Sequence, residues 1–76
     1  MVSRSNQAPP TLLEGSKGQA VKKLQAALAE LKILTSKIDG IFGPDTCQAV
    51  MEFQRSHQLT ADGVVGPKTW ADIIPD

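Results

Sequence analysis

The sequence predicts an all-α fold, a compact bundle of three helices, and three observations support this. Apolar residues recur at steps of three and four between Lys17 and Leu31, the spacing of one helix face. The pattern Asp-Gly, two apolar residues, Gly-Pro, any residue, Thr occurs twice, at 39–46 and 62–69. The pattern Ala-Val, two variable residues, a large apolar residue, Gln also occurs twice, at 20–25 and 49–54. These overlapping repeats indicate one duplicated supersecondary unit.

The first helix is expected from about Lys17 to Leu31. Ser16 followed three residues later by Gln19 fits a capping box, in which the two side chains satisfy free backbone N–H groups. The apolar stripe expected to face the core consists of Val21, Leu24, Leu28 and Leu31. After this helix, Ile33, Leu34 and Ile38 are expected to cover one end of the bundle, around Thr35-Ser36, without forming a strand.

Each Asp-Gly to Gly-Pro stretch is expected to be a tight turn that leads into a helix. Glycine adopts positive φ without steric cost, and proline is favoured at the first position of a helix. We expect both apolar residues of each turn to be anchors against the core. We also expect each threonine hydroxyl to bond the preceding Asp carboxylate. The residues assigned to these structural turns are Asp39, Gly40, Gly43, Thr46, Asp62, Gly63, Gly66 and Thr69.

The second helix is expected from Pro44 to about Ser56 or His57, and the third is a short helix that begins at Pro67. The second buries Ala49, Val50 and Phe53 and exposes Glu52 and Arg55. The third offers Trp70, Ile73 and Ile74 to the core before Pro75. Trp70 is expected to be buried rather than free to stack on a sugar, because aromatic residues are few and Ile73 lies one turn later.

Length and charge restrict the class of protein. The 76 residues suffice for one domain, expected at 11–76, and the polar residues 1–10 are interpreted as a flexible leader or linker. Eight basic and eight acidic residues cancel, which disfavours a nucleic-acid partner. No run of apolar residues is long enough to span a membrane. We expect a monomer.

Catalytic and metal chemistry is not expected, and neither is a cofactor. The single cysteine, Cys47, lies ten residues before the single histidine, His57, which is about 15 Å along a helix axis and too far for a thiolate pair. Cys47 is therefore interpreted as a small packing residue. Asp39 and Asp62 are interpreted as turn formers because each precedes glycine, and neither turn has the alternating acidic ligands of a calcium loop.

An ordered string of residues over most of the chain resembles a known family. The matching residues are Gly15, Gly18, Val21, Leu24, Gln25, Leu28 and Leu31; Asp39, Gly40, Phe42, Gly43, Thr46, Ala49, Val50, Phe53 and Gln54; and Leu59, Asp62, Gly63, Val65, Gly66, Pro67, Thr69 and Trp70. This string resembles the three-helix peptidoglycan-binding domain, an accessory module of bacterial cell-wall hydrolases. The resemblance implies noncatalytic binding of peptidoglycan, attachment to a hydrolase, and a location in the cell envelope.

Two positions depart from the pattern of that family. Glycine usually follows the first and second helices, where this chain has Lys32 and Gln58. Glycine is favoured there because the residue adopts the left-handed region, which strains other residues by roughly 1–2 kcal/mol. Either the helix ends differ here or these two residues tolerate the strain.

The predicted ligand surface is a shallow polar groove. Its residues are Ile41, Phe42, Gln54, Arg55 and His57, with backbone groups contributing at Ile41 and Phe42. The strongest single contact is expected from Arg55 to a carboxylate of a stem peptide. For Gln25 and Gln54, which end the repeated helix pattern, we favour amide contacts with loop backbone over ligand contact.

The main function prediction is targeting, in which weak contact with a polymer raises the local concentration of an attached or partner hydrolase. The alternative is a protein-interaction or propeptide-like domain, because similar three-helix units precede the catalytic domain of matrix metalloproteinases. In that family an Arg-Cys-Gly segment inhibits zinc, whereas Cys47 lies in Thr-Cys-Gln. A self-contained hydrolase is disfavoured by the lack of a catalytic set.

Overall fold

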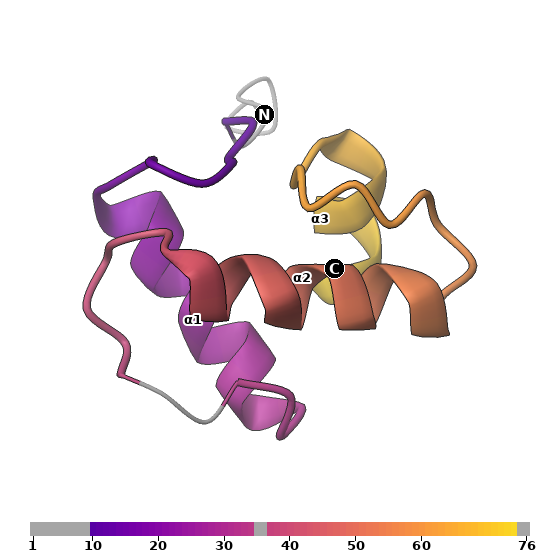
Figure 1. The fold of residues 1–76 in the computed structure, drawn as a ribbon, viewed down its shortest axis with the longest axis horizontal. Coiled ribbons are helices and arrows are strands. Elements are labelled where there is room, and N and C mark those ends of the chain that lie inside the picture. The colour runs from indigo at the N-terminus through magenta and orange to yellow at the C-terminus, as the bar shows by residue number, and fades with distance from the viewer. Residues whose placement is uncertain (1–9, 35–36, 75–76) are drawn as a thin grey trace, which may run out of the picture.

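A computed structural model describes residues 10–34 and 37–74, and it contains three helices (Figure 1). These are α1 (Gln19–Glu30), α2 (Pro44–Ser56) and α3 (Pro67–Ile73). Helix α1 contacts both α2 and α3. Within the described residues there is no strand, only two isolated bridges that pair Leu12 with Val65 and Lys17 with Ile41. The all-α three-helix prediction is confirmed. None of the three helices is long and apolar enough to cross a membrane.

The core lies where the three helices meet, and the connecting segments complete it. Its buried apolar residues are Val21, Leu24 and Leu28 from α1, Ala49, Val50 and Phe53 from α2, Trp70 and Ile73 from α3, and Leu12, Leu34, Phe42 and Val65 from the connections. The periodicity therefore identified the core faces of α1 and α2. In α3, Trp70 and Ile73 are buried as expected, but Ile74 is 36% exposed because it lies just past the end of the helix. A core of this size stabilises the chain through burial at about 25 cal/mol per Å² of apolar surface.

The start and end of α1 differ from the prediction. The expected capping box does not form, because the N-cap is Gly18, at φ 125°, with no side-chain cap. Ser16 lies outside the helix, where its Oγ accepts a hydrogen bond from the Leu13 N–H at 3.1 Å. At the other end Leu31 is the C-cap residue and is 49% exposed, so it is not part of the buried stripe.

Only some of the apolar residues expected as anchors are buried. Phe42 and Val65 are 1% and 0% exposed, but Ile41, which precedes Phe42, is 49% exposed. Successive side chains of an extended segment point to opposite sides, so one of each pair faces away from the core. In the connection after α1, Leu34 is buried whereas Ile38 is 46% exposed. Thr35, Ser36 and Pro75 lie outside the described residues.

Helices α1 and α2 end in the same way. Lys32 and Gln58 have φ of 63° and 61°, so these two non-glycine residues occupy the left-handed conformation and tolerate its strain. The Lys32 N–H donates to the Ala29 carbonyl at 2.9 Å, and the next N–H donates back to Leu28 at 3.0 Å. This pairing is the Schellman pattern, which satisfies carbonyl groups at a helix end.

The segment before α1 forms backbone hydrogen bonds with both Asp-Gly turns. Leu12 exchanges two backbone hydrogen bonds with Val65, at 3.1 and 2.8 Å. Farther along, Gly18 N–H donates to the Gly40 carbonyl at 2.9 Å. The indole N–H of Trp70 donates to the Pro10 carbonyl at 2.8 Å. Most of the predicted leader, 1–9, lies outside the described residues, and Pro10 contacts the bundle.

Replacing either left-handed residue by glycine should raise stability. Lys32→Gly and Gln58→Gly should each increase the free energy of unfolding by about 1 kcal/mol, because glycine removes the strain of positive φ. Urea unfolding followed by circular dichroism measures the change. As the control, Lys23→Gly inside α1 should lower stability by about 1 kcal/mol. A lower stability of both Lys32→Gly and Gln58→Gly would contradict the assignment of strain to these positions.

Candidate ligand-binding site

The first turn is built around the buried side chain of Gln25. This residue of α1 is 1% exposed, and its Nε2 donates to Asp39 Oδ1, the Ile41 carbonyl and Thr46 Oγ1 at 3.2, 3.0 and 3.0 Å. Its Oε1 accepts the Gly40 N–H at 2.9 Å. An amide nitrogen carries two hydrogens, so three acceptors share them. One side chain thus ties α1, the turn and the first turn of α2 together.

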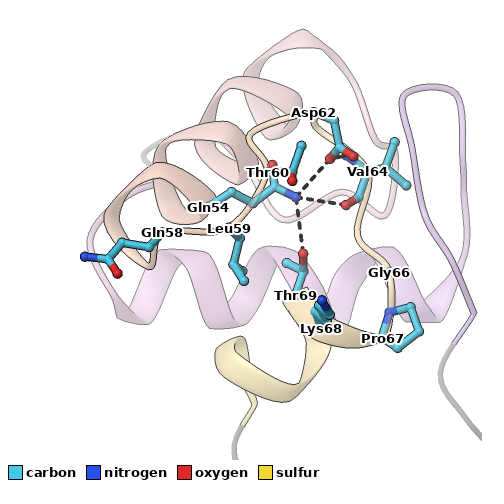
Figure 2. Close-up of a pocket in the computed structure, with 10 residues that line it drawn as sticks. All are labelled: Gln54, Gln58, Leu59, Thr60, Asp62, Val64, Gly66, Pro67, Lys68 and Thr69. Atoms are coloured by element: carbon cyan, nitrogen blue, oxygen red, sulfur yellow. Dashed lines mark hydrogen bonds between the residues drawn. The ribbon is translucent and has the colours of Figure 1, made fainter.

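Gln54 makes the same set of contacts in the second turn, and Figure 2 shows those of its Nε2. Its Nε2 donates to Asp62 Oδ1, the Val64 carbonyl and Thr69 Oγ1 at 3.2, 2.9 and 3.2 Å. Its Oε1 accepts the Gly63 N–H at 3.0 Å. We call the two sets the Gln25 cradle and the Gln54 cradle. Both amides reach loop backbone, as the sequence analysis expected.

The contacts of the two threonines and the two aspartates differ from the prediction. Each threonine hydroxyl accepts from the glutamine amide rather than bonding the aspartate. The Asp39 carboxylate instead accepts the Ile41 N–H at 3.0 Å, and Asp62 accepts the Val64 N–H at 3.0 Å. An aspartate side chain that bonds the backbone two residues later forms an Asx turn. The glutamine lies between the two groups that were expected to pair.

The glycine of each turn is required by its conformation and, in the second turn, by close packing. Gly40 and Gly63 both have φ of 77°, the region that disfavours other residues. A Cβ at Gly63 would lie 2.9 Å from Cys47 Sγ. Cys47 is partly buried and packs against the core, so it is a packing residue as expected.

Hydrogen bonding lowers the pKa of Asp39 below its usual value. The main cause is the Ile41 N–H, and the Gln25 amide adds to it. Both groups donate to the carboxylate and therefore favour its charged form.

Each cradle borders a shallow cavity. The cavity beside the Gln25 cradle, of about 400 Å³, is lined by Gln25, Lys37, Asp39, Ile41, Gly43, Pro44, Asp45 and Thr46. The cavity beside the Gln54 cradle, of about 530 Å³, is lined by Gln54, Gln58, Leu59, Thr60, Asp62, Val64, Gly66, Pro67, Lys68 and Thr69 (Figure 2). Seven of these lining positions correspond within the two repeats, and Lys37 lies two residues before the first turn as Thr60 does before the second. We call these the first cavity and the second cavity.

Comparison with known proteins identifies the family. The family model described as "Putative peptidoglycan binding domain" matches residues 17–73, most of the chain and both cradles. The chain belongs to the peptidoglycan-binding domain family.

Relatives of this peptidoglycan-binding domain include cell-wall enzymes. The zinc D-Ala-D-Ala carboxypeptidase of Streptomyces albus G is 46% identical over 65 residues, covering 83% of this chain and 26% of that protein. The SleB N-terminal domain superposes with a TM-score of 0.85 at 33% identity, over 87% of this chain and 90% of that one. The Burkholderia AP3 phage endolysin superposes with a TM-score of 0.82 at 42% identity, over 87% of this chain and 25% of that one.

Among such relatives, the chain spans 55% of a protein of Kitasatospora aureofaciens and 13% of an N-acetylmuramoyl-L-alanine amidase of Mycobacterium tuberculosis. The similarity to these proteins therefore concerns one part of each.

The structure separates the residues predicted to contact ligand. Ile41 precedes α2 and Arg55 lies in its last turn, so nearly the whole helix separates them, about 16 Å along its axis from Pro44. Phe42 is buried, and its backbone N–H and carbonyl bond Ser16 and Gly15 at 2.9 Å each. Gln54 is also buried, with its amide held in the cradle. Arg55 and the Ile41 side chain are exposed.

His57 contacts neighbouring side chains. Its ring stacks on Phe53 with centroids 4.0 Å apart, and its Nδ1 lies 3.7 Å from Asp72 Oδ2 on α3. The described residues contain no cluster of three or more His, Cys, Asp or Glu side chains that could hold a metal ion. The second cavity is also lined by Lys68, Thr60 and Gln58, which were not among the residues predicted to contact ligand. The unequal charges at Asp45 and Lys68, equivalent positions of the repeat, were a signal that could have revealed Lys68.

Removing a cradle glutamine should be among the most damaging single substitutions. Gln25→Ala and Gln54→Ala should each lower the free energy of unfolding by at least about 2 kcal/mol, because buried N–H and hydroxyl groups lose their partner. The control is Gln48→Ala, an exposed α2 residue, which should change stability by less than about 0.5 kcal/mol. Denaturant midpoints give the comparison, and equal midpoints for Gln25→Ala and Gln48→Ala would refute the cradle's importance.

The depressed pKa of Asp39 predicts a loss of stability in acid. A carboxyl whose folded pKa is lower than its unfolded value of about 3.9 stabilises the fold above that value. This contribution is lost as the pH falls through the folded pKa. Asp39→Asn should therefore flatten the decline in urea midpoint below about pH 4. Superimposable pH profiles for the variant and the wild type would show that Asp39 does not supply the effect.

Proposed function

We propose that this domain binds peptidoglycan without catalysing a reaction, and that it holds an attached or partner hydrolase at the cell wall. The observation that carries the proposal is the family match over 17–73. The fold agrees, since the SleB N-terminal domain superposes at a TM-score of 0.85.

The proposed partner is a catalytic domain of a cell-wall enzyme, in the same chain or another. Its support is the names of the relatives, which include a carboxypeptidase and N-acetylmuramoyl-L-alanine amidases. A domain that contacts a polymer weakly gains effective affinity when it is linked to a second binding module. The domain acts as a monomer in the cell envelope in this proposal.

The proposed contact surface lies at the end of α2 that carries Arg55. This side chain is exposed, and it follows Gln54, which lines the second cavity. Guanidinium groups bind carboxylates through paired, charge-assisted hydrogen bonds. The buried Gln54 positions this end of α2 against the turn. In this proposal Ile41 and Phe42 hold the first turn in place, and His57 holds the end of α2 against α3.

Co-sedimentation with purified insoluble peptidoglycan tests the function. The wild-type domain should pellet with the polymer, and Arg55→Ala should lower the bound fraction by roughly twofold to fivefold, the range for a partly solvated charge pair. Lys23→Ala, which removes the same charge from an exposed site on α1, should bind like the wild type. Partitioning no better than an inert protein of similar charge would overturn the proposal. Normal binding by folded Arg55→Ala would overturn only the role of Arg55.

A further inference from the structure

The two cavities are copies of one site that carry different charges. Gln25, Asp39, Gly43 and Thr46 in the first correspond to Gln54, Asp62, Gly66 and Thr69 in the second. In both, the aspartate Oδ1 is bonded by a backbone N–H and by the glutamine amide. The shared residues therefore build the turns, and the residues that differ are the ones left to select a ligand.

The charged residues of the two cavities differ at two equivalent positions. At the second position of the following helix, Asp45 lines the first cavity and Lys68 the second; two residues before the turn, Lys37 lines the first and Thr60 the second. The first cavity is lined by two carboxylates and one ammonium group, and the second by one of each. Among the described residues the only close contact between a basic and an acidic side chain joins His57 and Asp72, so within 10–34 and 37–74 neither the Lys68 nor the Lys37 ammonium pairs with a carboxylate. Each cavity thus has one ammonium group, Lys37 in the first and Lys68 in the second, but the first has an additional carboxylate. An anionic ligand group is therefore repelled less at the second cavity.

The lining of the second cavity suits a peptide better than a sugar ring. Its ten lining residues include no aromatic side chain, which sugar faces commonly need for stacking. Trp70 is 5% exposed, and its indole N–H donates to the Pro10 carbonyl, so it does not supply an aromatic surface for stacking. The lining offers instead the Lys68 ammonium and the Thr60 hydroxyl (Figure 2), groups that bond carboxylate and amide.

We propose that the second cavity is a subsite for a carboxylate of the peptide stem of peptidoglycan, with Lys68 as its cationic contact. The inference rests on the proposed function and narrows it to the peptide rather than the glycan. The cavity of about 530 Å³ has room for one or two residues of a peptide end. Lys68 supplies a point charge with three donors, and the Thr60 hydroxyl bonds an adjoining amide group.

Titration of the ¹⁵N-labelled domain with defined fragments tests the subsite. The probes are a stem pentapeptide ending in D-Ala-D-Ala, the same peptide with every carboxylate amidated, and a peptide-free GlcNAc–MurNAc oligosaccharide. The acidic peptide should shift backbone amides at 58–69 more than those at 37–46. Amidation should weaken binding roughly threefold to tenfold, as expected for loss of a charge-assisted contact. Shifts centred on 37–46, or tighter binding of the oligosaccharide, would overturn the proposal.

Substitution of Lys68 provides a second test of the subsite. Lys68→Ala should weaken binding of the acidic peptide roughly twofold to fivefold, and Lys68→Glu should weaken it further. Lys23→Glu makes the same change of net charge on α1, outside both cavities, and should bind like the wild type. Unchanged binding of Lys68→Glu to the peptide and to insoluble peptidoglycan would reject the subsite and leave the proposed function intact. Failure of the wild type to bind insoluble peptidoglycan would reject both.

Discussion

Two buried glutamine side chains are the constraint on which the fold depends. A primary amide taken out of water must place both its donors and its acceptor, because an unpaired buried polar group costs about 1–3 kcal/mol. Gln25 and Gln54 meet this requirement only when an Asx turn, a glycine N–H and a threonine hydroxyl converge on them. Each glutamine therefore fixes the position of a turn and of the helix that follows it.

The cradles also separate the residues that hold the fold from those that face outward. The glutamines and threonines are buried, and their hydrogen bonds are internal. Between the copies, Lys68 replaces Asp45 on the exposed side of the helix start. A change there alters the charge of a cavity without removing a bond from the cradle. The two similar turns thus carry cavities of different charge.

Much of the fold could be predicted because the responsible signals are local. The period of the apolar residues placed Val21, Leu24 and Leu28 on the core face, and Gly-Pro placed the starts of α2 and α3. The burial of Trp70 was also predicted correctly. The capping box at Ser16 was wrong because the segment before α1 pairs with the first turn, where Phe42 N–H donates to the Ser16 carbonyl at 2.9 Å. Such pairing depends on contacts between residues far apart in sequence.

The sequence by itself determined the three helices, the two turns and the repeat that relates them, since each follows from spacing along one stretch of chain. Only the tertiary structure decided which polar groups meet. It placed Thr46 against Gln25 rather than Asp39, and it separated Ile41 from Arg55 by the length of α2. It also gathered Thr60 and Lys68 around one cavity. Burial of the two amides decided these arrangements, because a buried amide selects its partners by position in space.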